Sequence, residues 1–416
     1  MEYSSLSKGL TNKLSSTIKK ENGIYFTPPS CVNSNIELLK PYMAEINHIL
    51  EPSCGSGEFI TSLKSSFSGQ VSITGIEYNE TIYNSISLQL NSSNVSILKQ
   101  DYLTFVPAKK YDLIIGNPPF YVMKKDSVDK IYYPYFDGRP NIFILFIIKS
   151  LELLNDNGIL SFILPKNFLN CLYYDKTRDY ISKNFKILNI VESTDKFIDT
   201  QQETIILIVR KLPVKTDIDN TKYVLSIHSY TIFVLEDNMN MNMNMNKILK
   251  LYENSKALWE LGFTVSVGNI VWNQCKDILT DDATKTRLIY CSDIVDNKLS
   301  IKKYKNGDKK NYIDKPGTNR SMIIINRGYG VGEYKFNYCL INDTGSYLIE
   351  NHLICIEYNN NNESKNIEKT ELIKMYEKII KSLKDERTQE FIKLYFGNNA
   401  INTTELNYIL PIYYDI

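Results

Sequence analysis

Short runs of β-branched and apolar residues alternate with helical stretches through the first half of the chain. The runs lie at residues 46–50, 71–77, 94–98, 111–116, 158–164, 187–192 and 204–210. Residues 141–155 carry apolar side chains at the i, i+3, i+4 spacing of a helix with one buried face, and Asn157-Gly158 predicts its end. Strands that alternate with helices form parallel βαβ units. The pattern therefore predicts an α/β fold with a seven-stranded, mostly parallel, doubly wound sheet.

The pattern changes near residue 210, which indicates a second domain. A hairpin is expected at residues 222–235, and a strict alternation of Asn and Met occupies residues 238–246. The alternation could form a strand, but Asn is a poor strand former and Met specifies packing weakly, so a low-complexity linker is favoured. Short strands at 321–326 and 347–358 then precede a helical stretch at 365–395. We predict domains at 1–237 and 247–416, joined by a linker at 238–246, with the second domain mixed α/β.

The composition is that of a globular protein, with 43% hydrophobic and 23% charged residues. The longest apolar run, residues 142–148, is far shorter than the ~20 residues that span a bilayer. The N-terminus has no apolar signal region, so we expect a protein of the bacterial cytoplasm or of a host compartment that holds viral DNA. The Asn-, Lys-, Ile- and Tyr-rich composition suggests an AT-rich genome, bacterial or viral. The seven cysteines form no CxxC pair, and the three histidines do not stand at ligand spacing. This pattern argues against a metal site and against a Ser-His-Asp hydrolase.

A net charge of +1 conceals a local basic segment in the second half. Residues 301–327 hold eight basic and two acidic side chains, a local charge of about +6. Such a segment can neutralise several phosphates of DNA, although a solvated loop would have the same composition. The candidate DNA-binding residues are Lys302, Lys303, Lys305, Lys309, Lys310, Arg320 and Arg327.

A glycine-containing segment, EPSCGSGEF at residues 51–59, lies between the first strand and a helix. Its glycines allow the backbone to approach a ligand at the carboxyl end of a strand, where open α/β sheets bind cofactors. Ile60 stands at the third glycine position of GxGxxG, and the acidic Glu58 at the helix start disfavours a pyrophosphate. A cofactor with a zwitterionic amino-acid tail fits better; the alternative is a plain strand-to-helix turn.

Acidic residues follow the next two strands. Glu77 ends the second strand, the position from which a carboxylate accepts hydrogen bonds from ribose hydroxyls. Asp101 and Tyr102 follow the third strand and offer an acceptor for an adenine amino group and a ring for its face. Each residue alone would be a surface side chain, but three successive strand ends together favour a nucleoside pocket.

The sharpest signal is Asn117-Pro118-Pro119-Phe120, directly after the fourth strand. An exocyclic amine on a base is a poor nucleophile because its lone pair is delocalised into the ring. Accepting its two N–H groups on the Asn117 side chain and the Pro118 carbonyl would favour a pyramidal, reactive nitrogen. The prolines fix φ and remove N–H donors, and Phe120 supplies a ring for base stacking. The alternative is a purely structural turn.

With these motifs, residues 20–210 resemble the γ-class amino-methyltransferases typified by the TaqI adenine methyltransferase. The motifs stand in the γ order: YFTPP at residues 25–29, EPSCGSGEF, IEYN, QDY, NPPF and a late Phe197. The family often has Tyr where Phe120 stands. The second half resembles the family's target-recognition domains only through residues 267–273 and the strand that begins at Ile323.

The resemblance implies a Rossmann-like methyltransferase fold that binds S-adenosylmethionine and methylates the N6 amine of a flipped adenine in duplex DNA. It implies that Thr27 and Glu51 contact the methionine part of the cofactor and that Cys54, Gly55 and Gly57 form the cofactor-binding turn. Glu77 would bind the ribose and Asp101 the adenine amino group. Tyr102 and Phe146 would line the adenine pocket. Asn117, Pro118 and Phe120 would be catalytic, and Phe197 would stack on the base opposite Phe120.

The expected protein is a monomeric modification enzyme of a restriction-modification system, without its own cleavage domain. A separate restriction endonuclease could be its partner. Three alternatives keep the chemistry and change the substrate: cytosine N4, a protein glutamine amide, or rRNA. A fourth is a catalytically silent DNA-specificity subunit, although the intact cofactor and NPPF segments argue against it.

Overall fold

A computed structural model describes residues 3–67, 71–193, 197–198, 200, 202–236, 243–327, 336–342, 345–359, 367–396 and 401–415. The chain divides into two compact units, Met1–Met245 and Asn246–Ile416. Within the described residues, no helix has the length and apolar character needed to span a membrane.

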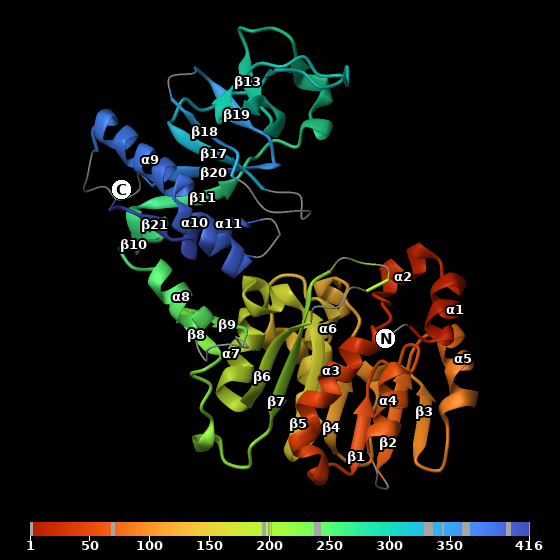
Figure 1. Ribbon diagram of the computed structural model, residues 1–416. Helices are drawn as coiled ribbons and strands as arrows, with labels where there is room; N and C mark the ends of the chain where they lie inside the picture. The colour runs from red at the N-terminus through yellow and green to blue at the C-terminus, as the bar shows by residue number, and fades with distance from the viewer. Residues whose placement is uncertain are drawn as a thin grey trace. The chain divides into compact units, whose positions relative to one another are not determined.

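The first unit is built on one sheet of seven strands among its described residues, in the order β3-β2-β1-β4-β5-β7-β6 (Figure 1). Neighbouring strands are parallel except where β7 is involved, since β7 runs antiparallel to both β5 and β6. This confirms the predicted α/β fold with a mostly parallel seven-stranded sheet. The strands are β1 His48–Glu51, β2 Ser72–Glu77, β3 Val95–Lys99, β4 Tyr111–Gly116, β5 Leu154–Pro165, β6 Lys186–Ser193 and β7 Thr204–Arg210.

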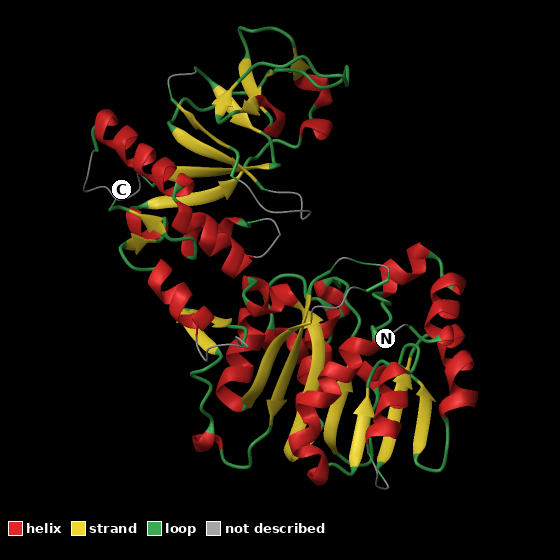
Figure 2. Ribbon diagram, in the orientation of Figure 1, coloured by secondary structure: helices red, strands yellow, loops and turns green. Residues whose placement is uncertain are grey.

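Helices cover both faces of this sheet because successive strand side chains point to opposite sides. In β1, Ile49 packs into a core cluster with α3, α4 and α5, while Leu50 packs into a second cluster with α6 and α7. Figure 2 shows the strands of this unit flanked by helices. The helices are α1 Ser5–Lys13, α2 Ser16–Asn22, α3 Pro29–Leu39, α4 Glu58–Ser66, α5 Glu80–Leu90, α6 Ile142–Glu152 and α7 Asp175–Asn184, and a hairpin of β8 Val224–Ile227 and β9 Tyr230–Phe233 follows the sheet.

The second unit combines small sheets with helices. Its described strands include a four-stranded sheet, β11-β20-β17-β18, and another, β12-β16-β13-β19. The bounds are β10 Ser255–Lys256, β11 Phe263–Val267, β12 Leu279–Thr280, β13 Thr286–Ile289, β14 Ile294–Val295, β15 Lys298–Leu299, β16 Tyr312–Ile313, β17 Met322–Asn326, β18 Tyr338–Ile341, β19 Tyr347–Ile349, β20 Leu353–Tyr358 and β21 Ile412–Tyr413. The helices are α8 Met243–Leu251, α9 Lys369–Lys384, α10 Glu386–Phe391 and α11 Thr403–Tyr408.

Several element ends differ from the sequence predictions. The helix expected to end at Asn157-Gly158 already ends at Glu152, and β5 begins at Leu154 and runs through Asn157, which adopts a positive φ of 65° at an irregular stretch of strand pairing. Residues 347–358 form two strands rather than one, and the helical stretch after residue 365 is divided at Asp385, which caps α10. In the Asn-Met tract, residues 243–246 belong to α8, while residues 238–242 lie outside the described residues.

One fully buried cation ties the edge of the first unit together. Arg178 of α7 has no exposed surface and donates hydrogen bonds to the carbonyl oxygens of Thr231 (2.5 Å), Phe168 (2.9 Å) and Cys171 (2.8 Å). Its guanidinium also lies 3.8 Å from the Asp175 carboxylate. Arg178 therefore holds β9 and the loop after β5 against α7.

Replacing Arg178→Met should lower the free energy of unfolding of the first unit by about 3–5 kcal/mol, because it leaves buried carbonyls and a carboxylate without their partner. Urea unfolding followed by far-UV circular dichroism measures this loss. Both tryptophans lie in the second unit, so tryptophan fluorescence should show that unit unchanged. Lys176→Met, which removes an exposed ion pair with Asp137, is the control and should change stability by less than about 0.5 kcal/mol. An Arg178→Met protein as stable as this control would contradict the assignment.

Candidate active site

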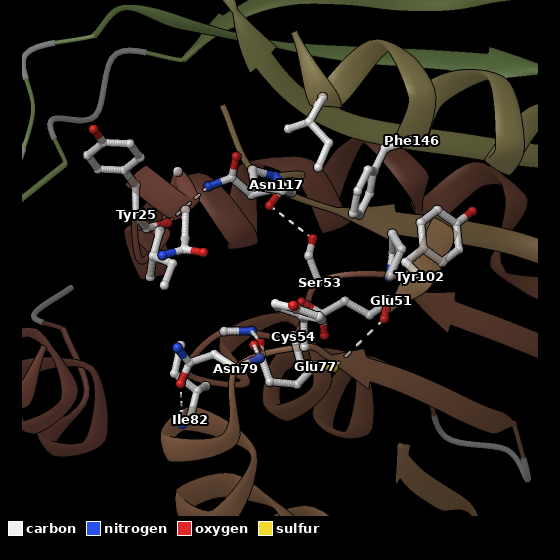
Figure 3. A pocket seen from close by; sticks show the side chains of 18 of the residues that line it. Tyr25, Glu51, Ser53, Cys54, Glu77, Asn79, Ile82, Tyr102, Asn117 and Phe146 are labelled. Atoms are coloured by element: carbon white, nitrogen blue, oxygen red, sulfur yellow. Dashed lines mark hydrogen bonds between the residues drawn. The ribbon is translucent and has the colours of Figure 1, made fainter. Parts of the chain in front are cut away.

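A cavity of about 300 Å³ opens at the carboxyl ends of β1, β2, β3 and β4. Parallel strands place their carboxyl ends on one edge of the sheet, so the residues that follow these four strands meet there. The segment between α2 and α3 completes the wall. Figure 3 shows these side chains pointing toward a shared space. Of the sequence-predicted residues, those that line the cavity are Thr27, Glu51, Cys54, Gly55, Glu77, Asp101, Tyr102, Asn117 and Phe146.

The glycine-containing turn connects β1 to α4 at the floor of the cavity. Gly57 adopts a positive φ of 77° and caps α4, and a Cβ atom there would stand 2.3 Å from the Leu90 side chain. Gly57 is absent from the cavity lining, so its role is to shape the turn. Gly55 lines the cavity and donates its N–H to the Glu77 carboxylate at 2.9 Å. Cys54 is buried, and this burial, followed by the charge of Glu51, raises the pKa of its thiol.

Two buried carboxylates face the cavity from neighbouring strand ends. Glu51 is 1% exposed, and burial followed by the charges of Glu77 and Glu58 raises its pKa well above the usual value. Its Oε2 atom is buried and has no hydrogen-bond partner among the described residues. Glu77 accepts N–H groups from Gly55 and Asn79 (2.7 Å), yet burial still raises its pKa to about 7. An ammonium group near Glu51 would satisfy its free oxygen and restore its charge.

An aromatic wall lies beyond the third strand. The rings of Tyr102 and Phe146 stand 4.8 Å apart and tilted by 46°. The Tyr102 hydroxyl is anchored by a 2.7 Å hydrogen bond with Ser150, and Asp101 accepts the N–H of Leu103 at 2.9 Å. A flat, apolar surface next to a carboxylate acceptor suits an adenine ring and its amino group. The residues present therefore fit S-adenosylmethionine at both its amino-acid and its nucleoside end.

The Asn117 side chain is oriented by the segment before α3. Its Nδ2 group donates to the Tyr25 carbonyl oxygen (3.2 Å) and to the Thr27 hydroxyl (3.1 Å). Its backbone carbonyl accepts a 3.1 Å hydrogen bond from the Ser53 hydroxyl, as Figure 3 shows. The Oδ1 atom is buried and has no partner among the described residues. A fixed amide whose acceptor is unused at a cavity is suited to receive an N–H group.

The structure does not bring the predicted base-stacking residues together. Phe120 packs edge-on against Phe143 at 5.9 Å, in the cluster with α6, whereas Phe197 is buried in the cluster on the opposite face of the sheet. Neither ring lines the cavity, and neither does Pro118. Tyr121 and Met123, which sequence reasoning missed, do line it. Their position directly after the NPPF motif is the feature of the sequence that could have predicted this.

Some side chains of the basic segment in the second unit are engaged in ion pairs or ring contacts. Lys310 pairs with Asp281 at 2.7 Å and Arg320 with Glu357 at 2.8 Å. The Lys309 ammonium lies 3.9 Å from the Tyr290 ring and 4.8 Å from the Tyr304 ring, and burial lowers its pKa. Folding brings the acids Asp281 and Glu357 to the segment, but it also brings Lys276 and Lys285, which pair with Asp308 and Asp314, so the local charge stays about +6. Lys302, Lys303, Lys305 and Arg327 remain exposed.

Sequence comparison finds a match of residues 13–198 to the family described as Eco57I restriction-modification methylase. The chain is 28% identical over 403 residues to Type II methyltransferase M.CvrRI of Paramecium bursaria Chlorella virus XZ-6E, covering 94% of each protein. It is 24% identical over 365 residues to modification methylase CviBIII of Paramecium bursaria Chlorella virus NC1A, covering 86% of this chain and 88% of the relative.

Structural comparison supports the same fold. The chain superposes on the solved structure described as the DrdV-DNA complex with a TM-score of 0.55 and 13% identity, covering 98% of this chain and 57% of the other. The methylase family and this fold imply S-adenosylmethionine as the cofactor, and the cavity residues fit it. By these matches, residues 13–198 are similar to restriction-modification methylases of the Eco57I type, and the chain as a whole is a homologue of Type II methyltransferases.

Proposed function

We propose that this methyltransferase methylates the N6 amine of an adenine in duplex DNA, as the modification enzyme of a restriction-modification system. The observation that carries the proposal is the Asn117 carboxamide, whose nitrogen is held by the protein and whose buried oxygen is free to accept a hydrogen bond at the cavity. An aromatic amine has N–H groups to donate and a lone pair that must leave conjugation to react. Asn117 suits that need.

The reaction follows from this placement. Bound S-adenosylmethionine supplies a methyl group on a positively charged sulfur. Asn117 Oδ1 accepts one N–H group of the amine, and the Pro118 carbonyl is proposed to accept the other. The amine nitrogen, held by Asn117 Oδ1, would accept the methyl carbon with the sulfonium sulfur as the leaving group, and the nitrogen would lose one proton to solvent. Catalysis is mainly positioning and hydrogen-bond polarisation, so no histidine base is needed.

The other cavity residues bind and orient the cofactor. Glu51 is proposed to meet the ammonium group and Thr27 the methionine end, because one holds a buried free oxygen and the other lies beside Asn117. Glu77 accepts the ribose hydroxyls, and Asp101 and Tyr102 meet the adenine. These assignments place the amino-acid end of the cofactor at the turn that precedes α4.

An adenine inside a duplex cannot reach such a cavity, so the target base must leave the stack at a cost of a few kcal/mol. The sandwich of the base between Phe120 and Phe197 stays a prediction; the two rings lie in separate clusters and outside the cavity lining. The second unit is proposed to recognise the DNA target, and its exposed lysines to contact phosphates. Cytosine N4 offers the same chemistry, and mapping of the modified base distinguishes it.

Replacing Asn117→Ala should lower turnover roughly 10²- to 10³-fold, the scale for loss of one preorganised polar group, while cofactor affinity changes less. Transfer of a labelled methyl group to duplex DNA measures turnover, and calorimetry measures cofactor binding. Asn184→Ala, on α7, removes a side chain of the same type that bonds to Tyr180 and Lys215 and should retain activity. Full activity of the Asn117→Ala enzyme would exclude the mechanism.

Affinity for S-adenosylmethionine should rise about tenfold between pH 6 and pH 8 through ionisation of Glu77. Its pKa is raised to about 7, so the carboxyl is mostly neutral at pH 6 and mostly charged at pH 8, where it accepts hydroxyl donors best. In the Glu77→Gln protein the pH dependence due to Glu77 disappears. Any pH dependence of cofactor affinity that remains comes from Glu51 and from ionisation of the ligand itself. Calorimetric titration of both proteins across the range measures the difference. Identical pH profiles for the two proteins would refute the role of Glu77.

The three exposed lysines Lys302, Lys303 and Lys305 should contribute to the salt dependence of DNA binding. Their joint replacement by Ser should reduce the slope of log K against log salt by up to about 2.7, because each phosphate contact contributes about 0.9. Fluorescence anisotropy at several salt concentrations measures the slope. The control replaces the exposed Lys374, Lys378 and Lys381 of α9 by Ser, which changes the net charge equally. Equal slopes for the two triple variants would show that the loop does not contact DNA.

A further inference from the structure

The second unit holds an exposed histidine whose ring is fixed by a buried carboxylate. His352 lies in the turn between β19 and β20, and its side chain is 61% exposed, whereas that of Glu350 is 4% exposed. The Nδ1 atom of His352 contacts Glu350 Oε1, and the His352 backbone N–H lies 3.3 Å from Glu350 Oε2. Burying a carboxylate costs free energy. In return, this contact fixes the ring of a side chain that stays largely exposed to solvent.

The turn that carries His352 lies against the segment after β11. A Cβ atom at Gly268 would stand 2.3 Å from the Glu350 carbonyl oxygen, so only glycine allows this approach. The Gly268 N–H donates to Leu353 at 3.0 Å, and the Asn351 N–H donates to Ile270 at 2.9 Å. These bonds clamp the two segments together and place the exposed Asn269 beside the histidine turn. The segment at residues 267–273 is the one whose sequence resembles target-recognition domains.

A third segment brings a guanidinium to the same edge. Arg327 follows β17, which pairs with β20 in the sheet, and Figure 1 shows β11, β17 and β20 side by side. Arg327 is exposed and donates to the Asn351 carbonyl oxygen at 3.4 Å. One edge of the sheet thus presents an imidazole, a guanidinium and a carboxamide. These are side chains that read the hydrogen-bonding edges of base pairs.

We propose that His352, positioned by Glu350 and flanked by Arg327 and Asn269, reads base edges of the DNA target in the major groove. The inference rests on the proposed function insofar as the ligand is DNA, and it adds the residues that determine sequence preference. Glu350 is a positioning residue, since it acts through His352. A rigid side chain is needed for this role, because discrimination between bases requires hydrogen bonds of fixed direction.

The test is selection of preferred sites by the full chain from a library of duplexes with randomised positions. His352→Ala should lose preference roughly tenfold or more at one or two positions and keep it elsewhere. Glu350→Gln, which keeps the shape but removes the charge, should weaken preference at the same positions and to a smaller extent. His228→Asn, in the turn between β8 and β9 of the first unit, is the control and should select the wild-type sites.

Two results would overturn the inference. One is a selection profile of His352→Ala identical to the wild type. The other is a uniform loss of affinity across all sequences with a smaller salt slope, which marks a phosphate contact. Thermal unfolding of each variant shows whether the fold is kept, and the exposed His352→Ala change serves if Glu350→Gln is unstable. Because selection needs no methyl transfer, a protein that selects sites but does not methylate adenine would refute the proposed function and leave this inference standing.

Discussion

The hydrogen bonds from Asn117 to the segment before α3 are the constraint on which the site depends. They join residues 90 and 92 positions apart in the sequence and decide which end of the carboxamide faces the cavity. If the nitrogen faced inward, the group would repel the N–H donors of an amine. A backbone carbonyl and a threonine hydroxyl at the cavity wall thus make this neutral side chain a hydrogen-bond acceptor toward the cavity. The segment that contains Tyr25 and Thr27 is therefore as much a part of the candidate active site as Asn117 is.

Much of the first unit could be predicted because local pattern and tertiary burial agree there. Each of the seven strands is a short β-branched run between polar turns, and parallel order brings Glu51, Glu77, Asp101 and Asn117 to one edge without further information. Strand and helix ends were less predictable. Asn157 looked like a helix stop, but it adopts its left-handed conformation inside β5, where the pairing with β4 is irregular.

Contacts between distant residues explain the remaining differences. A count of charges along residues 301–327 could not show which of them are paired, because the partners Lys276, Asp281, Lys285 and Glu357 lie outside the segment. Phe120 and Phe197 stand at motif positions in the segments that follow β4 and β6, yet they pack into different clusters. The contact between Glu350 and His352 is local in sequence. The neighbouring segment at residues 267–273 lies beside it only because Gly268, more than eighty residues earlier, allows the close approach.

Cys54 lies in the turn that lines the cavity, and the protonated state of its thiol limits its reactivity toward a methyl donor bound there. A thiolate is a far better nucleophile than an aromatic amine, and the reactive form of a cysteine is the thiolate. A sulfonium methyl donor held near a thiolate would alkylate the protein itself. Burial and the charge of Glu51 raise the pKa of the Cys54 thiol and keep it protonated. The turn can therefore contain a cysteine without its sulfur being methylated by the donor.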